Sequence, residues 1–288
     1  MNIHDFKTKD HRQVFYIEDS SADGGIPLLK FHLFDSLQMV DYGITTRSGG
    51  VSQGIFSTLN LSYTRGDDKT AVDENYHRTA VSLHADASDF VLTDQTHTVH
   101  VRKVTRADRG KGIIRERDYQ DVDGLITNEP DLVLAAFFAD CVPLLFIDPV
   151  HRAVGVSHSG WRGTVARMGR ETICAMQNAY GSRPQELYCA IGPSVCQDCY
   201  EVSADVAERF LEEFPQAGSS LCRPGAPGKF QLDLWKANAL VLLEAGVLKE
   251  HLAVTNICTC CNPGLLFSHR ASRGKRGNFG AFIRLRHS

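Results

Sequence analysis

The stretch around Phe137–Thr164 constrains the fold more than any other part of the chain, because three apolar runs follow each other there with almost no spacing. The runs Leu132–Phe138, Val142–Ile147 and Ala153–Val156 have the length and residue types of buried strands. The turn Asp148–His151 separates the second run from the third. Strands this close together favour a mixed sheet over strict alternation of strands and helices.

The rest of the chain mixes helical and extended patterns along its whole length. We expect helices at about 70–84, 164–180, 203–214 and 233–245, and further strands at about 90–94, 99–105, 187–191, 252–257 and 279–285. The segment Ser219–Gly228, rich in proline and glycine, is expected to be a loop. There is no internal repeat and no long linker. The predicted fold class is therefore α/β (α+β), a single domain of layered mixed sheets flanked by helices.

Charge and hydropathy exclude several classes of protein. The 288 residues carry a formal net charge of −3, which gives no electrostatic reason to expect nucleic acid or an anionic membrane as a partner. No apolar run approaches the roughly 18 residues of a membrane-spanning helix. The first residues are polar and do not form a signal peptide, so we expect a cytoplasmic location.

Nine cysteines are an odd number for a disulfide framework, so reduced thiols are expected. Cys196 and Cys199 have C-x-x-C spacing, which is typical of metal or redox sites only when a second pair accompanies it. We do not count the group Cys258, Cys260 and Cys261 as that second pair. These cysteines are therefore predicted to be structural thiols that pack as small hydrophobic residues.

Three residues stand apart by their positions near strand ends. His97 follows one predicted strand, Cys141 lies at a strand junction directly after Asp140, and His158 is expected just beyond the third apolar run. Two imidazoles and one thiolate can bind Zn²⁺ and leave a fourth position for water or substrate. Alternatively, Cys141 is a nucleophile and His158 its general base. Both hypotheses require Cys141 and His158 to meet in space.

A third interpretation of the histidines is copper oxidase chemistry. A trinuclear copper cluster requires many histidines, typically in His-x-His pairs. The chain contains no such pair among its twelve histidines, and the nearest spacing is that of His97 and His100. The pattern favours zinc over copper.

Three arginines are candidates for binding an anionic substrate. Arg47 lies in a loop with Gly49 and Gly50, where the backbone can approach a ligand closely. Arg162 begins a predicted helix, whose N-terminus attracts anions, and Arg270 follows a serine and a histidine. Each is equally compatible with a structural salt bridge. Neither GxGxxG nor a P-loop is present, so a nucleotide site of those kinds is not supported.

In these residues the chain resembles the laccase-domain family, also called YfiH-like or multicopper polyphenol oxidase-like, whose members act as purine nucleoside phosphorylases. The resemblance covers residues from about 40 to 286. The matching motifs are Thr46–Ser52, Leu59–Leu61, Gly66–Asp68, Gln95–His97, Asp123–Thr127, Ala139–Pro143, His158–Gly163, Ile191–Pro193, Tyr200–Val202, Cys258–Thr259 and Phe267–Arg270. It implies a fold similar to that of toxin deamidases with a Cys–His pair. Residues 36–288 would form the catalytic domain, with residues 1–35 unassigned.

The resemblance also implies the chemistry. Zinc would be bound by His97, Cys141 and His158, which are the predicted catalytic residues. The implied activities are phosphorolysis of adenosine, inosine and 5′-methylthioadenosine, together with adenosine deamination. The partners would be a purine nucleoside and phosphate, without nucleic acid or membrane. The alternatives are a Cys–His hydrolase or polyphenol oxidase that edits peptidoglycan precursors, and a structural zinc module with four protein ligands and no pocket.

The chain departs from the family pattern at three places. Ser159 replaces an alanine, Cys260 and Cys261 are additional, and the segment Lys275–Asn278 replaces a Thr-Gly-Arg sequence.

Phosphorolysis requires a cation beside the sugar to hold phosphate. We expect Arg47 to be the first candidate for this role and Arg162 the second.

Overall fold

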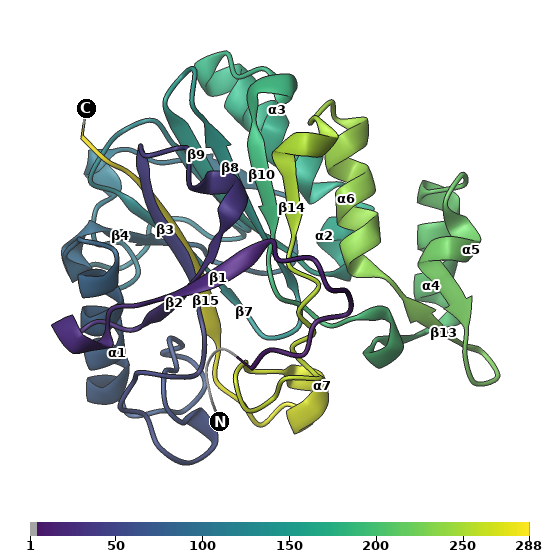
Figure 1. The fold of residues 1–288 in the computed structure, drawn as a ribbon, viewed down its shortest axis with the longest axis horizontal. Coiled ribbons are helices and arrows are strands. Elements are labelled where there is room, and N and C mark those ends of the chain that lie inside the picture. The colour runs from purple at the N-terminus through teal and green to yellow at the C-terminus, as the bar shows by residue number, and fades with distance from the viewer. Residues whose placement is uncertain (1–4, 288) are drawn as a thin grey trace.

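The computed structural model describes residues 5–287, which form two six-stranded sheets and a smaller three-stranded one (Figure 1). In spatial order the first sheet contains β1 Phe15–Asp19, β2 Pro27–Phe31, β3 Val40–Thr45, β15 Phe279–Leu285, β7 Val133–Phe138 and β4 Phe90–Leu92. The second contains β14 Leu252–Val254, β10 Tyr188–Ile191, β8 Val142–Asp148, β9 Ala153–Ser159, β6 Gly124–Thr127 and β5 Val101–Lys103. The third contains β11 Glu201–Ser203, β13 Lys229–Leu232 and β12 Cys222–Pro224.

Helices connect and cover these sheets. The α-helices are α1 Lys69–Ser82, α2 Trp161–Val165, α3 Met168–Tyr180, α4 Ala204–Glu213, α5 Gly218–Leu221, α6 Leu234–Glu244 and α7 His269–Ser272. Short 3₁₀ helices are η1 Ser21–Asp23, η2 His32–Phe34, η3 Gly54–Phe56, η4 Ala87–Asp89, η5 Arg106–Asp108, η6 Pro184–Glu186, η7 Gln197–Cys199 and η8 Lys249–His251. No helix within residues 5–287 combines the length and the apolar character that crossing a membrane requires.

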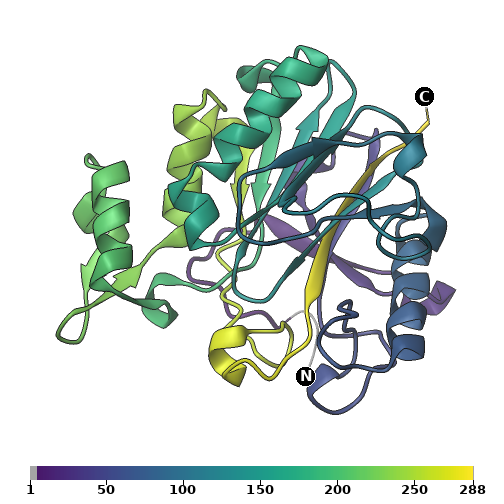
Figure 2. The same ribbon diagram turned by 180° about the vertical axis from the view of Figure 1, so that it is seen from behind.

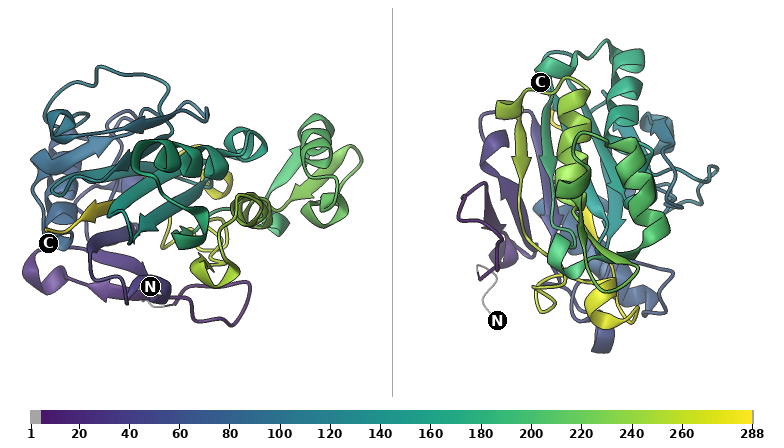
Figure 3. Two further views of the ribbon diagram at one scale, coloured as in Figure 1. Left: turned by 90° about the horizontal axis from the view of Figure 1, so that it is seen from above. Right: turned by 90° about the vertical axis from the view of Figure 1, so that its right-hand side faces the viewer.

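The two large sheets pack face to face, and each is covered on its outer face by helices. Side chains alternate along β8, so that Leu145 and Ile147 point into the core between the sheets. Leu144 and Phe146 point the other way, into the core under α3 and α6. Burial on both faces explains the continuous apolar runs in the sequence. Figure 3 shows α3 and α6 gathered on one side of the sheets.

The predicted mixed, layered α/β fold is confirmed. The pairs β4–β7, β5–β6 and β10–β14 are parallel, and the other strand pairs of the large sheets are antiparallel. Figure 2 shows the C-terminal strand β15 crossing the first sheet, where it separates β3 from β7. The caps of α1 and α6 are Asp68 and Asp233, whose carboxylates accept backbone N–H groups at 2.9 Å.

Two secondary-structure predictions were wrong. The helix expected at 164–180 is two helices, α2 and α3, because Arg167 between them adopts a left-handed conformation with φ of 61°. The loop expected at Ser219–Gly228 contains the end of α5 and all of β12, which pairs with β13 across the small sheet. In Figure 1 this small sheet and α4 and α5 project from the body of the molecule.

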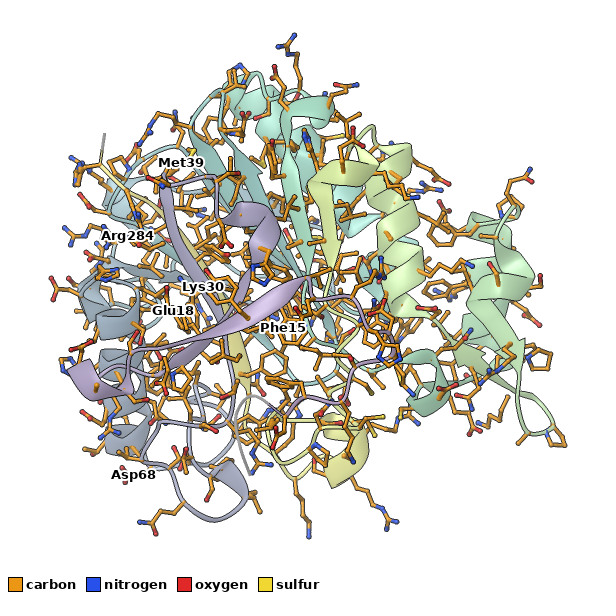
Figure 4. The ribbon with its side chains drawn as sticks, in the orientation of Figure 1. Phe15, Glu18, Lys30, Met39, Asp68 and Arg284 are labelled. Carbon is orange, nitrogen blue, oxygen red and sulfur yellow. The ribbon has the colours of Figure 1, made fainter. Side chains whose placement is uncertain are left out.

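The N-terminal segment contributes the edge of the first sheet. Strands β1 and β2 pair antiparallel, with Ile17 opposite Leu29. Lys30 of β2 extends over the sheet to Glu18 of β1, with a distance of 3.0 Å between the ammonium and the carboxylate (Figure 4). Diagonal pairs of this kind stabilise neighbouring strands modestly.

Candidate functional site

The structure brings His97, Cys141 and His158 together at one place. Their nitrogen and sulfur donor atoms all lie within 4.8 Å of one another. The Cys141 sulfur is 3.9 Å from Nε2 of His97, and the rings of His97 and His158 are 4.9 Å apart and nearly perpendicular. The sheet produces this proximity because β8 and β9 pair in a register that places His158 opposite Pro143. His158 was expected beyond the strand, but it lies inside β9.

Asp123 positions two of these residues, and its role was not predicted from the sequence. Its fully buried carboxylate accepts a hydrogen bond from Nδ1 of His158 at 2.7 Å. It also accepts the backbone N–H groups of Thr96, His97 and Thr98, at 3.0, 3.2 and 2.9 Å. Because Nδ1 of His158 is occupied, its Nε2 faces the site. A carboxylate behind a histidine is the usual second layer of a metal site.

Charge stabilises the thiolate form of Cys141. Burial opposes ionisation of this thiol, but His158 and His97 lower its pKa to about 6. Burial likewise opposes protonation of His158, which is 4% exposed, while the Cys141 thiolate and Asp123 raise its pKa to about 9. Without a metal the two residues therefore form a thiolate–imidazolium pair near neutral pH. Thiolate is also the form that binds metals.

The backbone around the site is strained and closely packed. His97 and Asp140 both have positive φ, at 68° and 95°, and such values cluster at functional sites. The Asp140 carboxylate is fixed by the Thr259 hydroxyl and by the backbone N–H of Arg270, both at 2.6 Å. A Cβ at Gly160 would lie within 3.0 Å of both the His97 ring and the Cys141 sulfur. The donors thus surround a small space that a single added carbon would disturb.

This donor set suits a metal ion such as zinc. Two imidazoles and one thiolate are typical zinc ligands, and three protein ligands leave one position open. His158 is oriented by Asp123, as metal-binding histidines usually are. Within residues 5–287 this is the only compact group of three or more metal-ligand side chains that contains a histidine.

The three residues line part of a pocket of about 330 Å³. Three aromatic side chains, Tyr63, Tyr76 and Phe137, are among the other residues that line it. Two arginines at the pocket, Arg65 and Arg276, have no acidic partner in the described part of the chain. Its mixture of aromatic and cationic groups suits a small anionic and heteroaromatic substrate pair.

Arg276 is the more buried of the two arginines. Burial, together with repulsion by Arg65, lowers its pKa to about 10, so it remains charged at neutral pH. Its guanidinium donates to the Asn278 side chain and to the carbonyl of Gly277, while its Nε is buried without a partner. A third arginine in this pocket, Arg117, is already paired with Asp94 at 2.9 Å. The unpaired cations are therefore Arg65 and Arg276, which sequence reasoning missed.

The structure places Arg47 outside this pocket. Its guanidinium donates to the carbonyls of Ser57 and Pro263, at 2.9 and 2.7 Å, and lies 4.5 Å from the Phe267 ring centre. Burial lowers its pKa. The loop backbone is also occupied, because the N–H of Gly50 donates to the Thr58 hydroxyl. Both the side chain and this amide therefore already have partners within the protein.

The other two predicted arginines, Arg162 and Arg270, also have partners within the protein. Arg162 stacks on Trp161, with 4.4 Å between the guanidinium carbon and the ring centre. It borders a second hollow that also contains His97 and His100. Arg270 donates to the carbonyl of Glu201 at 2.9 Å. Neither arginine lines the larger pocket.

The chain is similar to known proteins over most of its length. Residues 41–286 match the family model described as multi-copper polyphenol oxidoreductase laccase. The purine nucleoside phosphorylase YlmD of Bacillus subtilis is 40% identical over 245 residues, which cover 84% of this chain and 87% of that protein. A protein named adenosine deaminase, from an unknown prokaryotic organism, is 33% identical over 85% of this chain and 94% of its own length. The crystal structure of YlmD from Geobacillus stearothermophilus superimposes with a TM-score of 0.86 at 36% identity, covering 96% of this chain and all of that one.

Proposed function

This chain belongs to the multi-copper polyphenol oxidoreductase laccase family, and we propose that it is a zinc-dependent purine nucleoside phosphorylase that also deaminates adenosine. The proposed substrates are adenosine, inosine and 5′-methylthioadenosine, with phosphate as the second substrate. The names of the relatives support this activity. The observation that carries it is that His97, Cys141 and His158 line the same pocket as two arginines without an acidic partner among the described residues. A cytoplasmic location and a catalytic domain spanning residues 36–288 are part of the same proposal.

Phosphate would be bound by Arg276 and Arg65. Phosphorolysis joins a phosphate oxygen to C1′ of the ribose and breaks the bond between C1′ and the purine nitrogen. Positive charge develops on the sugar, and the purine leaves as an anion. Positioning and electrostatic stabilisation should therefore supply most of the rate. Two arginines without acidic partners are available to neutralise the phosphate and orient it.

The three converging residues would have a role separate from phosphate binding, because they would hold the metal. Asp123 holds the His158 ring in place, and the absence of a side chain at Gly160 leaves room for Cys141 and His97. When bound, zinc would act as a Lewis acid and lower the pKa of water, which deamination requires. The aromatic wall, including Phe137 and Tyr63, offers an apolar surface for the purine base and displaces water from the reacting groups.

The direct test is release of hypoxanthine from inosine by the purified protein, with and without phosphate, alongside metal analysis. We expect base release that depends on phosphate and roughly one zinc per intact three-ligand site. Base release at the same rate without phosphate would identify a hydrolase instead.

The second candidate is a Cys–His hydrolase or deaminase without metal. The observation that favours it is the low pKa of Cys141 beside His158. Removal of metal separates the two candidates, because a nucleophilic Cys141 keeps its activity after chelation and reacts with an alkylating reagent that abolishes it.

A further inference from the structure

A second group of metal-ligand side chains lies apart from the proposed active site. The sulfurs of Cys196, Cys199, Cys258 and Cys261 all lie within 4.8 Å of one another. These cysteines were expected to be separate structural thiols, and that expectation overlooked a spacing. Cys258 and Cys261 are three positions apart, so they form a second C-x-x-C pair beside Cys196 and Cys199. Two such pairs are typical of structural zinc sites.

Strand topology brings the two pairs together. β10 and β14 are parallel neighbours, with Ile191 opposite Val254, so their carboxyl ends meet at one edge of the second sheet. A further bridge between Ser194 and Cys258 extends this pairing beyond the strands. Each pair of cysteines follows one of these strand ends. The proximity of the four thiols therefore depends on the sheet and is not a consequence of one flexible loop.

The geometry suits a tetrahedral ion. Four sulfurs at about 2.3 Å from zinc are separated from each other by about 3.8 Å. The sulfurs of Cys199 and Cys261 are 3.6 Å apart. That distance is far longer than the roughly 2.05 Å of a disulfide bond, and all nine cysteines are free.

Backbone amides surround the sulfurs as they do in C-x-x-C metal sites. The N–H groups of Cys196 and Cys261 point at the sulfur of Cys258, at 3.3 and 3.4 Å. Such donors stabilise a thiolate rather than a thiol. A cation is also near, because Lys9 is paired with Asp198, between the first two cysteines, at 2.9 Å. Although Asp198 balances its charge, Lys9 is close enough to interact with Cys196 and Cys261.

We propose that Cys196, Cys199, Cys258 and Cys261 bind a structural zinc ion, separate from the proposed catalytic metal. Four protein ligands fill its coordination sphere, so this site has no open position for substrate. The ion would join two parts of the molecule. One is the small projecting sheet, which begins at β11 directly after the first pair, and the other is the segment that leads from the second pair to α7.

The proposed zinc would also support the active site from a distance. Thr259, between the two cysteines of the second pair, donates its hydroxyl to the Asp140 carboxylate at 2.6 Å. The N–H of Val195, which precedes the first pair, donates to the Asp140 carbonyl at 3.1 Å. Asp140 is the strained residue before Cys141. Both cysteine pairs are thus anchored to the residue that sets the position of Cys141.

The test uses full-length protein in which the other metal site is disabled. Cys141→Ala leaves only His97 and His158 there, a pair too weak to retain zinc through purification. We expect this variant to contain about one zinc per chain and its X-ray absorption spectrum to show four sulfur neighbours at about 2.3 Å. A folded Cys141→Ala protein without metal, or with zinc bound mainly by nitrogen and oxygen, would overturn the proposal. The visible thiolate-to-iron bands of a four-cysteine iron site would overturn the assignment to zinc.

A matched pair of variants provides the second test. We expect Cys261→Ser to lose one zinc per chain and to melt at a lower temperature than the wild type. Cys260→Ser, which removes the neighbouring thiol outside the four-sulfur group, should keep its zinc. Equal zinc content in the two variants would contradict the proposal, as would a Cys199–Cys261 disulfide in protein purified without oxidant. Should Cys261→Ser fail to fold, the Cys141→Ala spectrum still decides the matter.

Discussion

Replacement of Arg276 by methionine should weaken phosphate binding more than nucleoside binding. Methionine keeps an unbranched apolar stem of similar length but removes the charge and the donors. In the wild-type protein the guanidinium of Arg276 is half-buried at the pocket and has no acidic partner within the described residues. Asp140 and Cys141 lie near enough to interact with its charge, but burial and Arg65 outweigh them and lower its pKa.

The magnitude follows from the strength of a hydrogen bond to a charged group, about 1.5–3 kcal/mol. Since about 1.4 kcal/mol corresponds to a factor of ten, the apparent KM for phosphate should rise roughly ten- to hundredfold. Arg65 is exposed, and exposed ion pairs contribute about 0–1 kcal/mol, so Arg65→Met should raise this KM by about fivefold at most.

The assay is steady-state release of hypoxanthine from inosine, with phosphate and nucleoside varied separately. Arg47→Met is the matched comparison, because the sequence favoured Arg47 while the structure directs its guanidinium to backbone carbonyls. We expect Arg47→Met to lower the melting temperature and to leave the phosphate KM near the wild-type value. A raised phosphate KM in Arg47→Met together with an unchanged one in Arg276→Met would refute this assignment of the phosphate site.

Three further predictions concern the metal site. Asp123→Asn removes the carboxylate that orients His158 and should weaken zinc binding roughly ten- to hundredfold in chelator competition; unchanged affinity would show that this orientation is unimportant. Gly160→Ala places a carbon 3.0 Å from the Cys141 sulfur and should reduce zinc content without changing the circular dichroism spectrum, a result that normal zinc content would contradict. In metal-free protein, Cys141 should react with iodoacetamide at a rate that falls as pH drops through about 6, where its thiolate becomes protonated; a midpoint at the ordinary thiol value of about 8.5 would argue against the thiolate–imidazolium pair.

The sequence predicted best those strands and helices whose residue pattern arises within the element itself. The strands β7, β8 and β9 were recognised because both of their faces are buried, which leaves continuous apolar runs. The helices α1 and α6 were recognised from their aspartate caps. In contrast, β1, β2 and the small sheet were missed. The strands β1 and β13 are short and partly exposed, and β2 is fully buried but only five residues long, so each carries little local signal.

The same distinction holds for the site residues: those marked by a local pattern were predicted, and most of those placed only by the folded chain were not. His97, Cys141 and His158 could be proposed because their positions near strand ends and the family motifs single them out. Asp123 was treated as a turn residue, since only the folded chain shows its carboxylate beneath His158. Arg276 lies where the chain departs from the family pattern, and nothing local shows that it faces the pocket. The second C-x-x-C pair, by contrast, was visible in the sequence at Cys258 and Cys261, and a systematic count of spacings would have found it.

The most direct test of the proposed mechanism is phosphate-dependent base release from inosine, measured as metal is removed from the protein and then restored. Circular dichroism would show that the fold persists at each step. We predict that activity disappears with the metal bound by His97, Cys141 and His158 and returns when zinc is added. Full activity in folded protein after exhaustive metal removal would contradict a metal-dependent phosphorylase and would favour Cys141 as a nucleophile.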